Sequence, residues 1–209
     1  MSHAIHFIRH TPCHIRNSIA AAWGAALFLR TFIQRPSTVG SVCPSSAALT
    51  DRLLAGISRR DDGLVIDLGA GSGPVSAAML RSGIARDRII AVEALGGFAA
   101  PFSARCPGVR LVVGDARNLN AILDREAPGR PVSAIVSSLP FRVLGPDLTR
   151  DILRELHLVL RERGGTLVQY SYAWWMRYPL RASGFTPMRA SIEWKNLPPA
   201  RVEAYAAGG

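Results

Sequence analysis

From about residue 63 to its end, the chain alternates between short apolar runs and longer amphipathic stretches. The apolar runs predict strands, and the amphipathic stretches have the spacing of helices. The predicted strands are 64–68, 88–93, 109–113, 132–137, 166–172, 191–194 and 201–205, and the predicted helices are 45–57, 74–81, 98–105, 119–125 and 147–161. This alternation predicts an α/β fold, a mostly parallel seven-stranded sheet with helices on both faces. No helix separates the last two strands, so we expect them to form an antiparallel hairpin at one edge.

The segment before residue 36 predicts a separate amphipathic helix. Residues 19–29 carry no charge, but this run is shorter than the roughly 20 residues that cross a bilayer. Arg16, Arg30 and Gln34 fall on one side of a helix that Pro36 ends, and apolar side chains fall on the other. A signal peptide is disfavoured because Arg30 closes the run and no cleavage site follows it. The pattern alone favours a helix packed on the core slightly over one that lies in a lipid interface.

The composition is that of a folded and strongly basic protein. The 209 residues are 48% hydrophobic and 19% charged, which excludes a disordered chain, and the net charge is +10. All but one of the 25 cationic side chains are arginines, and residues 1–60 hold seven of them against one aspartate. This bias favours binding to nucleic acid or to an anionic membrane, with a merely solvated basic face as the alternative. Cys13, Cys43 and Cys106 lack metal-ligand spacing, so we expect reduced thiols and no metal site.

A glycine-rich turn follows the first predicted strand. The segment Asp67-Leu-Gly69-Ala-Gly71-Ser-Gly73 leads into Pro74, a favourable first residue of a helix. Glycines there allow a sharp turn and the close approach of a ligand to the backbone. The dinucleotide-binding fingerprint requires glycine or alanine at position 74, so the proline argues against it. The pattern instead resembles motif I of class I S-adenosylmethionine-dependent methyltransferases.

Two acids at later strand ends strengthen that resemblance. Glu93 ends the second strand, and Asp115 follows the third. In such folds, ligands bind at the carboxyl edge of the sheet. The resemblance implies that the methionine part of the cofactor is held by Asp67, Gly69, Gly71 and Gly73. It places the ribose at Glu93 and Ala94 and the adenine at Asp115 and Ala116. Ser137 is also expected among the cofactor-binding residues. S-adenosylmethionine is therefore the expected cofactor, with S-adenosylhomocysteine as its product.

The segment after the fourth strand bears on the methyl acceptor. It reads Ser137-Ser138-Leu139-Pro140, whereas class I enzymes that act on planar amino groups carry an Asn/Asp-Pro-Pro-aromatic motif there. The missing amide argues against a nucleobase amine and for a small tetrahedral nitrogen, which serine hydroxyls and backbone carbonyls could orient.

Over residues 25–206 the chain resembles the soluble bacterial phospholipid N-methyltransferases, which convert phosphatidylethanolamine to phosphatidylcholine. The resemblance is carried by segments 28–30, 39–46, 136–140, 169–172 and 196–202, among which Ser-Ser-Leu-Pro and Asn-Leu-Pro-Pro-Ala-Arg-Val are the most distinctive. It implies a membrane-surface helix within an extension of residues 1–36, a methyltransferase domain of residues 37–209, and a peripheral location on the inner face of the cytoplasmic membrane. The expected partners are an anionic lipid surface and the lipid substrate, without nucleic acid or an obligate protein partner.

The same resemblance assigns residues to the substrate side. Ser137, Ser138 and the Leu139 carbonyl are expected to face the lipid amine. Tyr172 would hold that amine or help to remove its proton, with an ordinary aromatic strand residue as the alternative. Arg201 would bind the lipid phosphate, and a surface ion pair is nearly as compatible with the sequence.

Other functions stay open from the sequence. The net positive charge and a general similarity to ribosomal RNA dimethylases are compatible with an RNA adenine N6-methyltransferase. Against it stand the missing Asn/Asp-Pro-Pro-aromatic motif and the lack of a C-terminal RNA-binding domain. A different amine lipid, such as an ornithine lipid, and a non-enzymatic membrane-binding module are the remaining alternatives.

Overall fold

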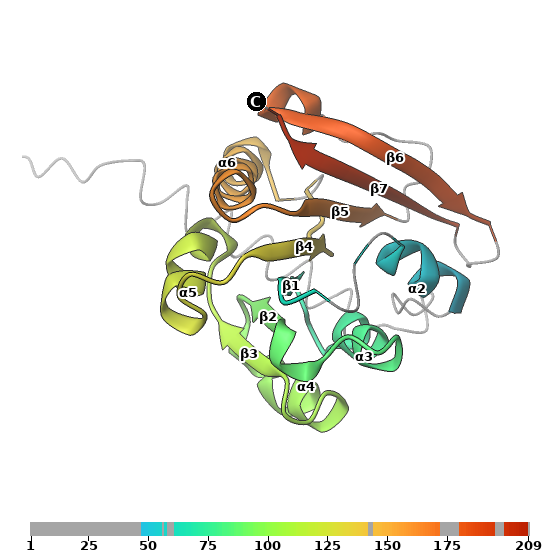
Figure 1. The fold of residues 1–209 in the computed structure, drawn as a ribbon, viewed down its shortest axis with the longest axis vertical. Coiled ribbons are helices and arrows are strands. Elements are labelled where there is room, and N and C mark those ends of the chain that lie inside the picture. The colour runs from blue at the N-terminus through green and yellow to red at the C-terminus, as the bar shows by residue number, and fades with distance from the viewer. Residues whose placement is uncertain are drawn as a thin grey trace, which may run out of the picture.

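The computed structural model describes residues 47–55, 57, 61–141, 144–171, 180–194 and 199–208. In this part of the chain, seven strands form one sheet in the order β3-β2-β1-β4-β5-β7-β6 (Figure 1). Strands β1 to β5 run parallel, and β7 lies antiparallel to both β5 and β6. The strands are β1 (Leu64–Leu68), β2 (Ile89–Glu93), β3 (Arg110–Val113), β4 (Val132–Ser137), β5 (Thr166–Ser171), β6 (Phe185–Glu193) and β7 (Ala200–Ala207).

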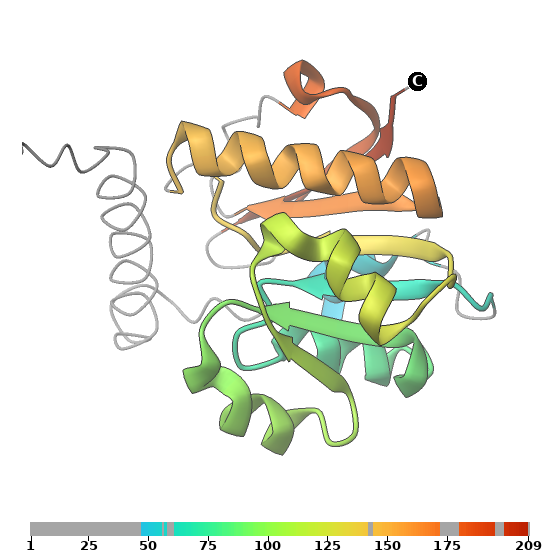
Figure 2. The ribbon, with the colours of Figure 1, turned by 90° about the vertical axis from the view of Figure 1, so that its left-hand side faces the viewer.

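Helices cover both faces of this sheet, as Figures 1 and 2 show. One apolar core lies under α5 and α6, and a second lies under α2, α3 and α4. The helices are α2 (Ala47–Leu54), α3 (Pro74–Arg81), α4 (Ala99–Arg105), α5 (Leu119–Glu126) and α6 (Pro146–Arg163), with short 3-10 turns η1 (Arg86–Arg88), η2 (Gly96–Phe98), η3 (Ala116–Asn118) and η4 (Leu180–Ser183). The fold is Rossmann-like, as the sequence predicts.

The local sequence explains the central elements. All five residues of β1 are buried, as expected for a strand covered on both faces. Helix α6 buries Ile152, Leu153, Leu156, Val159 and Leu160, whose spacing follows the helical period. It begins with a proline at its first turn and ends at a glycine with positive φ, both favourable positions for these residues.

The topology brings distant parts of the chain together at one edge. After β1 the chain builds β2 and β3 on one side, then returns to build β4 and β5 on the other. The last residue of β1, Leu68, is therefore in register with Val92 of β2 and with Ser137 of β4. Ligands of open α/β sheets bind where the strand order reverses in this way. The loops after β1, β2, β3 and β4 are thus the place to look for a site.

Most elements begin and end within one to three residues of the prediction, and the antiparallel edge hairpin is confirmed. The exception is β6, which begins at Phe185 rather than at residue 191. Residues 186–190 are exposed and their register with β7 shifts between Pro187 and Arg189, so no alternation of apolar and polar positions marks them as a strand. The amphipathic helix before Pro36 lies outside the described residues, and the division at residue 36 stays a prediction.

Candidate active site at the carboxyl ends of the strands

The glycine turn connects β1 to α3. Gly69, Gly71 and Gly73 all have positive φ, a conformation that other residues rarely adopt. A Cβ on Gly69 would lie 2.9 Å from the Leu139 side chain, so this glycine lets the turn and the loop after β4 pack together. A Cβ on Gly71 would meet no atom of the described residues within 4 Å. The backbone at Gly71 therefore borders open space, where a ligand can approach it.

Asp67, next to the last residue of β1, connects this strand to the start of α3. Its side chain is fully buried, and its Oδ2 accepts hydrogen bonds from Ser76 N (2.9 Å) and Ser76 Oγ (2.6 Å) at the start of α3. The other oxygen, Oδ1, is buried and has no hydrogen-bond partner within the described part of the chain. Burial raises the pKa of Asp67 to about 6, although the hydrogen bonds from Ser76 act in the opposite direction.

Glu93 supports the same turn from β2. The side chain is buried, its Oε2 accepts a hydrogen bond from Gly71 N (2.9 Å), and its Oε1 accepts one from Leu95 N (3.0 Å). Each carboxylate oxygen has two lone pairs, so each oxygen of Glu93 can accept one more hydrogen bond besides these two. Glu93 can therefore brace the turn and accept two hydroxyl groups of a ligand.

Asp115 lies beyond β3 and is paired with Arg117, which the sequence analysis did not single out. Arg117 donates to both carboxylate oxygens, with Nη2 2.6 Å from Oδ2, and its backbone N–H donates to Oδ1 (2.8 Å). Burial alone raises the pKa of Asp115, but the hydrogen bonds and charge of Arg117 outweigh it and lower this pKa. The carboxylate is thus ionised at neutral pH.

The loop after β4 lies against the glycine turn. Ser138 N donates to Leu68 O (2.9 Å), which ties the loop to the end of β1. Ser137 is fully buried, and its Oγ accepts a 3.3 Å bond from Leu139 N. The Leu139 carbonyl, which the sequence assigns to the lipid amine, accepts a 3.1 Å hydrogen bond from Gln169 Nε2 of β5. Gln169 belongs to the segment that carries the resemblance, but no pattern in the sequence assigns it a role.

The last two predicted substrate residues lie beyond β5. Arg201 is buried more deeply than a surface ion pair would be: its side chain is 13% exposed, and its Nη2 donates to Glu203 Oε1 (2.9 Å). Its Nε is buried and has no hydrogen-bond partner among the described residues. Tyr172 lies outside the described residues, so its role stays a prediction.

These loops enclose a cavity of about 210 Å³. Seven of the predicted site residues line it, namely Gly69, Glu93, Ala94, Asp115, Ala116, Ser138 and Leu139. The opposite wall is apolar and comes from Pro140, Leu144, Leu148 and Ile152. Asp67, Gly71, Gly73, Ser137 and Arg201 are not among the lining residues. Their predicted contacts with a ligand stay predictions, whereas their contacts with the protein are those given above.

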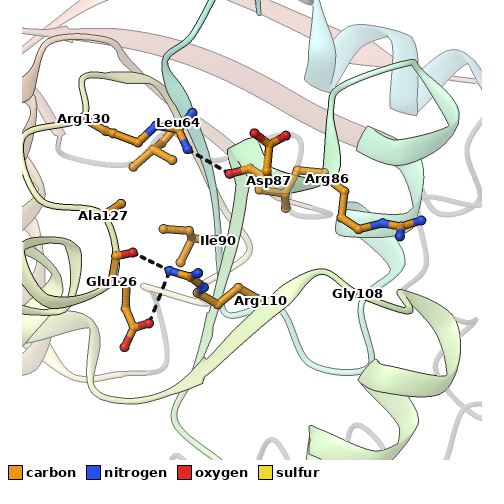
Figure 3. Close-up of a pocket in the computed structure, with 10 residues that line it drawn as sticks. Leu64, Arg86, Asp87, Ile90, Gly108, Arg110, Glu126, Ala127 and Arg130 are labelled. Atoms are coloured by element: carbon orange, nitrogen blue, oxygen red, sulfur yellow. Dashed lines mark hydrogen bonds and ion pairs between the residues drawn. The ribbon is translucent and has the colours of Figure 1, made fainter.

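A larger hollow of about 450 Å³ lies at the opposite, amino edge of the sheet (Figure 3). Three arginines border it, but two of them are held by the protein itself. Arg110 Nη1 donates to the Glu126 carbonyl and pairs with its carboxylate (3.6 Å), and Arg130 Nη1 donates to Asp87 O (2.9 Å). The guanidinium of Arg86 points away from the hollow in Figure 3. These side chains brace loops, so this hollow is not the candidate active site.

The hydrogen-bond acceptors in and around the cavity at the carboxyl edge match the donor groups of S-adenosylmethionine. The free acceptor positions of Glu93 suit ribose hydroxyls, and the unpartnered Oδ1 of Asp67 suits a cationic amino group near the glycine turn. The open backbone at Gly71 and the apolar wall leave room for a flat, partly apolar ligand. The residues present are compatible with the predicted cofactor.

In comparisons with known proteins, the chain is similar to methyltransferases. No protein-family profile matches the chain. The chain is 29% identical over 177 residues to an ornithine lipid N-methyltransferase of Singulisphaera acidiphila, a match that covers 83% of this chain and 91% of the relative. It is 37% identical over 97 residues to ribosomal RNA small subunit methyltransferase A of Streptomyces avermitilis, but this match covers 43% of the chain and 30% of that protein.

A solved structure supports the fold. The 1,6-didemethyltoxoflavin-N1-methyltransferase of Burkholderia thailandensis, bound to S-adenosylhomocysteine, superposes with a TM-score of 0.62 at 18% identity, over 98% of this chain and 94% of that chain. The predicted fold class is therefore confirmed. The chain has the fold of the class I S-adenosylmethionine-dependent methyltransferases, and S-adenosylmethionine is the cofactor that its glycine turn, acidic strand ends and fold together support.

Proposed function

We propose that the protein transfers methyl groups from S-adenosylmethionine to the primary amine of a zwitterionic lipid headgroup at a membrane surface. The observation that carries this proposal is the match to an ornithine lipid N-methyltransferase over 91% of that relative's length. The apolar wall of Pro140, Leu144, Leu148 and Ile152 beside Ser138 and Leu139 is compatible with a substrate that brings apolar groups with its amine. Phosphatidylethanolamine, implied by the sequence resemblance, and an ornithine lipid share the reacting amine.

The chemistry requires alignment more than acid or base strength. S-adenosylmethionine supplies a methyl group on a sulfonium; the amine's lone pair forms the new N–C bond while the electrons of the broken S–C bond stay on sulfur. The amine must first lose its extra proton, because only the neutral nitrogen has a free lone pair. Glu93 and Asp115 are bound to backbone N–H groups and to Arg117, respectively, so they act as binding groups rather than bases.

The protein's own residues then position two ligands against each other. Glu93 and the glycine turn fix one side of the cavity, and the loop of Ser138 and Leu139 fixes the other. The Leu139 side chain packs on Gly69. The loop after β4, which we call the substrate loop, and the glycine turn after β1 therefore move together. Holding reactants in this way is a large source of rate acceleration.

We also propose that the chain works at the membrane as a peripheral protein on the inner face of the cytoplasmic membrane. The arginines of the extension before residue 36 would bind anionic headgroups, and its apolar face would enter the interface. Within the part of the chain that the structure describes, no helix is both long and apolar enough to cross a bilayer.

The RNA alternative keeps one specific observation, the match to a ribosomal RNA methyltransferase over 43% of this chain. That segment is about the length of the cofactor-binding half of the fold, which methyltransferases with different substrates share. The lipid proposal is preferred because its relative is matched nearly from end to end.

The deciding experiment incubates the purified chain with methyl-labelled S-adenosylmethionine and anionic vesicles. Parallel samples contain phosphatidylethanolamine, an ornithine lipid, neither lipid, or an RNA oligonucleotide. Label in one or both amine lipids supports the proposal and identifies the headgroup. Label in RNA alone, or in no sample while S-adenosylhomocysteine binding is measurable, refutes it. The Glu93→Ala variant supplies the background.

A further inference from the structure

Gln169 lies in the strand next to the substrate loop. It is in register with Ser137 of β4 on one side and with Glu203 of β7 on the other, and its side chain is only 1% exposed. Its Nε2 donates to two backbone carbonyls, those of Leu139 and Tyr170, both at 3.1 Å. Because both partners are acceptors, the orientation of the amide is determined.

The other end of this amide has no partner. Gln169 Oε1 is buried and accepts no hydrogen bond from the residues that the structure describes. Buried side-chain oxygens are nearly always paired, because an unpaired one has lost water without compensation. Gln169 is not among the residues that line the cavity, but its amide bonds to Leu139, which does line it. The unpaired oxygen is therefore an acceptor that a ligand could use next to the cavity wall.

The contact with Leu139 connects this acceptor to the cofactor turn. The Leu139 side chain packs on Gly69, while its carbonyl is held by Gln169. Leu139, which lines the cavity, therefore contacts both the glycine turn and the Gln169 amide.

The surroundings of Gln169 match a zwitterion. Glu203 and Arg201 occupy the same face of the sheet as Gln169, on the neighbouring strand, and pair with each other (2.9 Å). Glu203 is buried, and Arg201 retains a buried Nε without a partner. A buried carboxyl and a guanidinium with an unpaired N–H thus lie on the strand next to Gln169 and on the same face of the sheet.

We propose that Gln169 receives the substrate amine: its Oε1 accepts an N–H of the headgroup nitrogen, while the bond from Nε2 to Leu139 fixes its direction. This inference rests on the proposed function. An N–H held by Oε1 restricts how the nitrogen turns and so directs its lone pair toward the methyl group. Gln169 neither gives nor takes a proton. Deep burial means that the amine leaves water as it reaches this oxygen.

The number of methyl groups already on the nitrogen gives a sharp test. A neutral primary amine has two N–H groups, whereas a neutral tertiary amine has none to donate to Oε1. Replacing Gln169 should therefore slow the first transfer strongly and leave transfer to the N,N-dimethylated headgroup nearly unchanged. A residue that merely supports the fold would affect both substrates equally.

The experiment compares Gln169→Met with wild type on vesicles that contain the accepted lipid or its N,N-dimethyl form. Leu167→Val, on the same strand and the same face, is the control for lost packing. For Gln169→Met we expect kcat on the primary amine to fall about 10- to 100-fold, with a loss under threefold on the dimethyl form. Affinity for S-adenosylhomocysteine and the pH profile should stay near wild type, whereas the melting temperature should fall because the carbonyls of Leu139 and Tyr170 each lose a hydrogen bond.

For Leu167→Val we expect a lower melting temperature with kcat unchanged on both lipids. An unchanged kcat of Gln169→Met on the primary amine, or an equal loss on both lipids, overturns the role of Gln169 and leaves the proposed function standing. A wild-type chain that binds S-adenosylhomocysteine but methylates no amine lipid overturns both.

Discussion

The buried carboxyl of Asp67 should make the stability of this protein depend on pH in an unusual direction. Its pKa is about 6 in the folded chain, against 3.8 for an unperturbed aspartate, because burial disfavours the charged form. Between these values the folded state binds more proton than the unfolded state, so stability falls as pH rises. The shift of about two pKa units destabilises the folded state by about 3 kcal/mol when the carboxyl is ionised. This destabilisation is nearly complete above pH 6 and small below about pH 4.

The Asp67→Asn variant isolates this effect. Asparagine keeps an oxygen for the bonds from Ser76 and places its NH₂ where Oδ1 has no partner. Urea unfolding of both proteins from pH 4 to pH 7.5 gives the difference in their free energies of unfolding, in which all other titrations cancel. Between pH 4 and pH 7.5 we expect this difference to shift by about 2.5 kcal/mol in favour of Asp67→Asn. A difference that is constant within about 1 kcal/mol across this range would refute the reasoning.

Three further predictions concern the cofactor and the membrane. Gly71→Ala and Gly129→Ala should lose similar stability, about 1–2 kcal/mol, because both glycines have positive φ and open space at Cβ; only Gly71→Ala should weaken binding of S-adenosylhomocysteine in calorimetry. Glu93→Ala should weaken that binding at least tenfold, and an unchanged affinity would mean that Glu93 does not hold the ribose. Removal of residues 1–36 should abolish sedimentation with anionic vesicles, and retained binding would eliminate the interfacial helix.

Much of the fold was predictable because its physical determinants are local. The five buried residues of β1, the proline that starts α3 and the apolar spacing of α6 each identify their element without any knowledge of neighbours. Strand β6 shows the limit of this approach. Its residues 186–190 are exposed at the edge of the sheet and form a strand because β7 pairs with them.

The cofactor side of the site was predictable for the same reason. A glycine turn and acids at strand ends lie next to the elements that carry them, and parallel strands bring their carboxyl ends to one edge. Arg117 was missed although it is two residues from Asp115, because no sequence pattern indicates whether an arginine turns back onto an acid or toward water.

Alternation of strands and helices, the glycine turn, and the acids that end β2 and follow β3 determined from sequence alone that this chain is an α/β protein with a ligand site at one sheet edge. Only the tertiary structure decided that Gln169, 30 residues beyond Leu139, holds its carbonyl, and that Arg201 is buried against Glu203. The physical reason is that the contact of Gln169 with Leu139 depends on the pairing of β5 with β4, and that the burial of Arg201 depends on the place of β7 between β5 and β6. Hydrogen-bond partners across strands are chosen by topology and register, which no local spacing encodes.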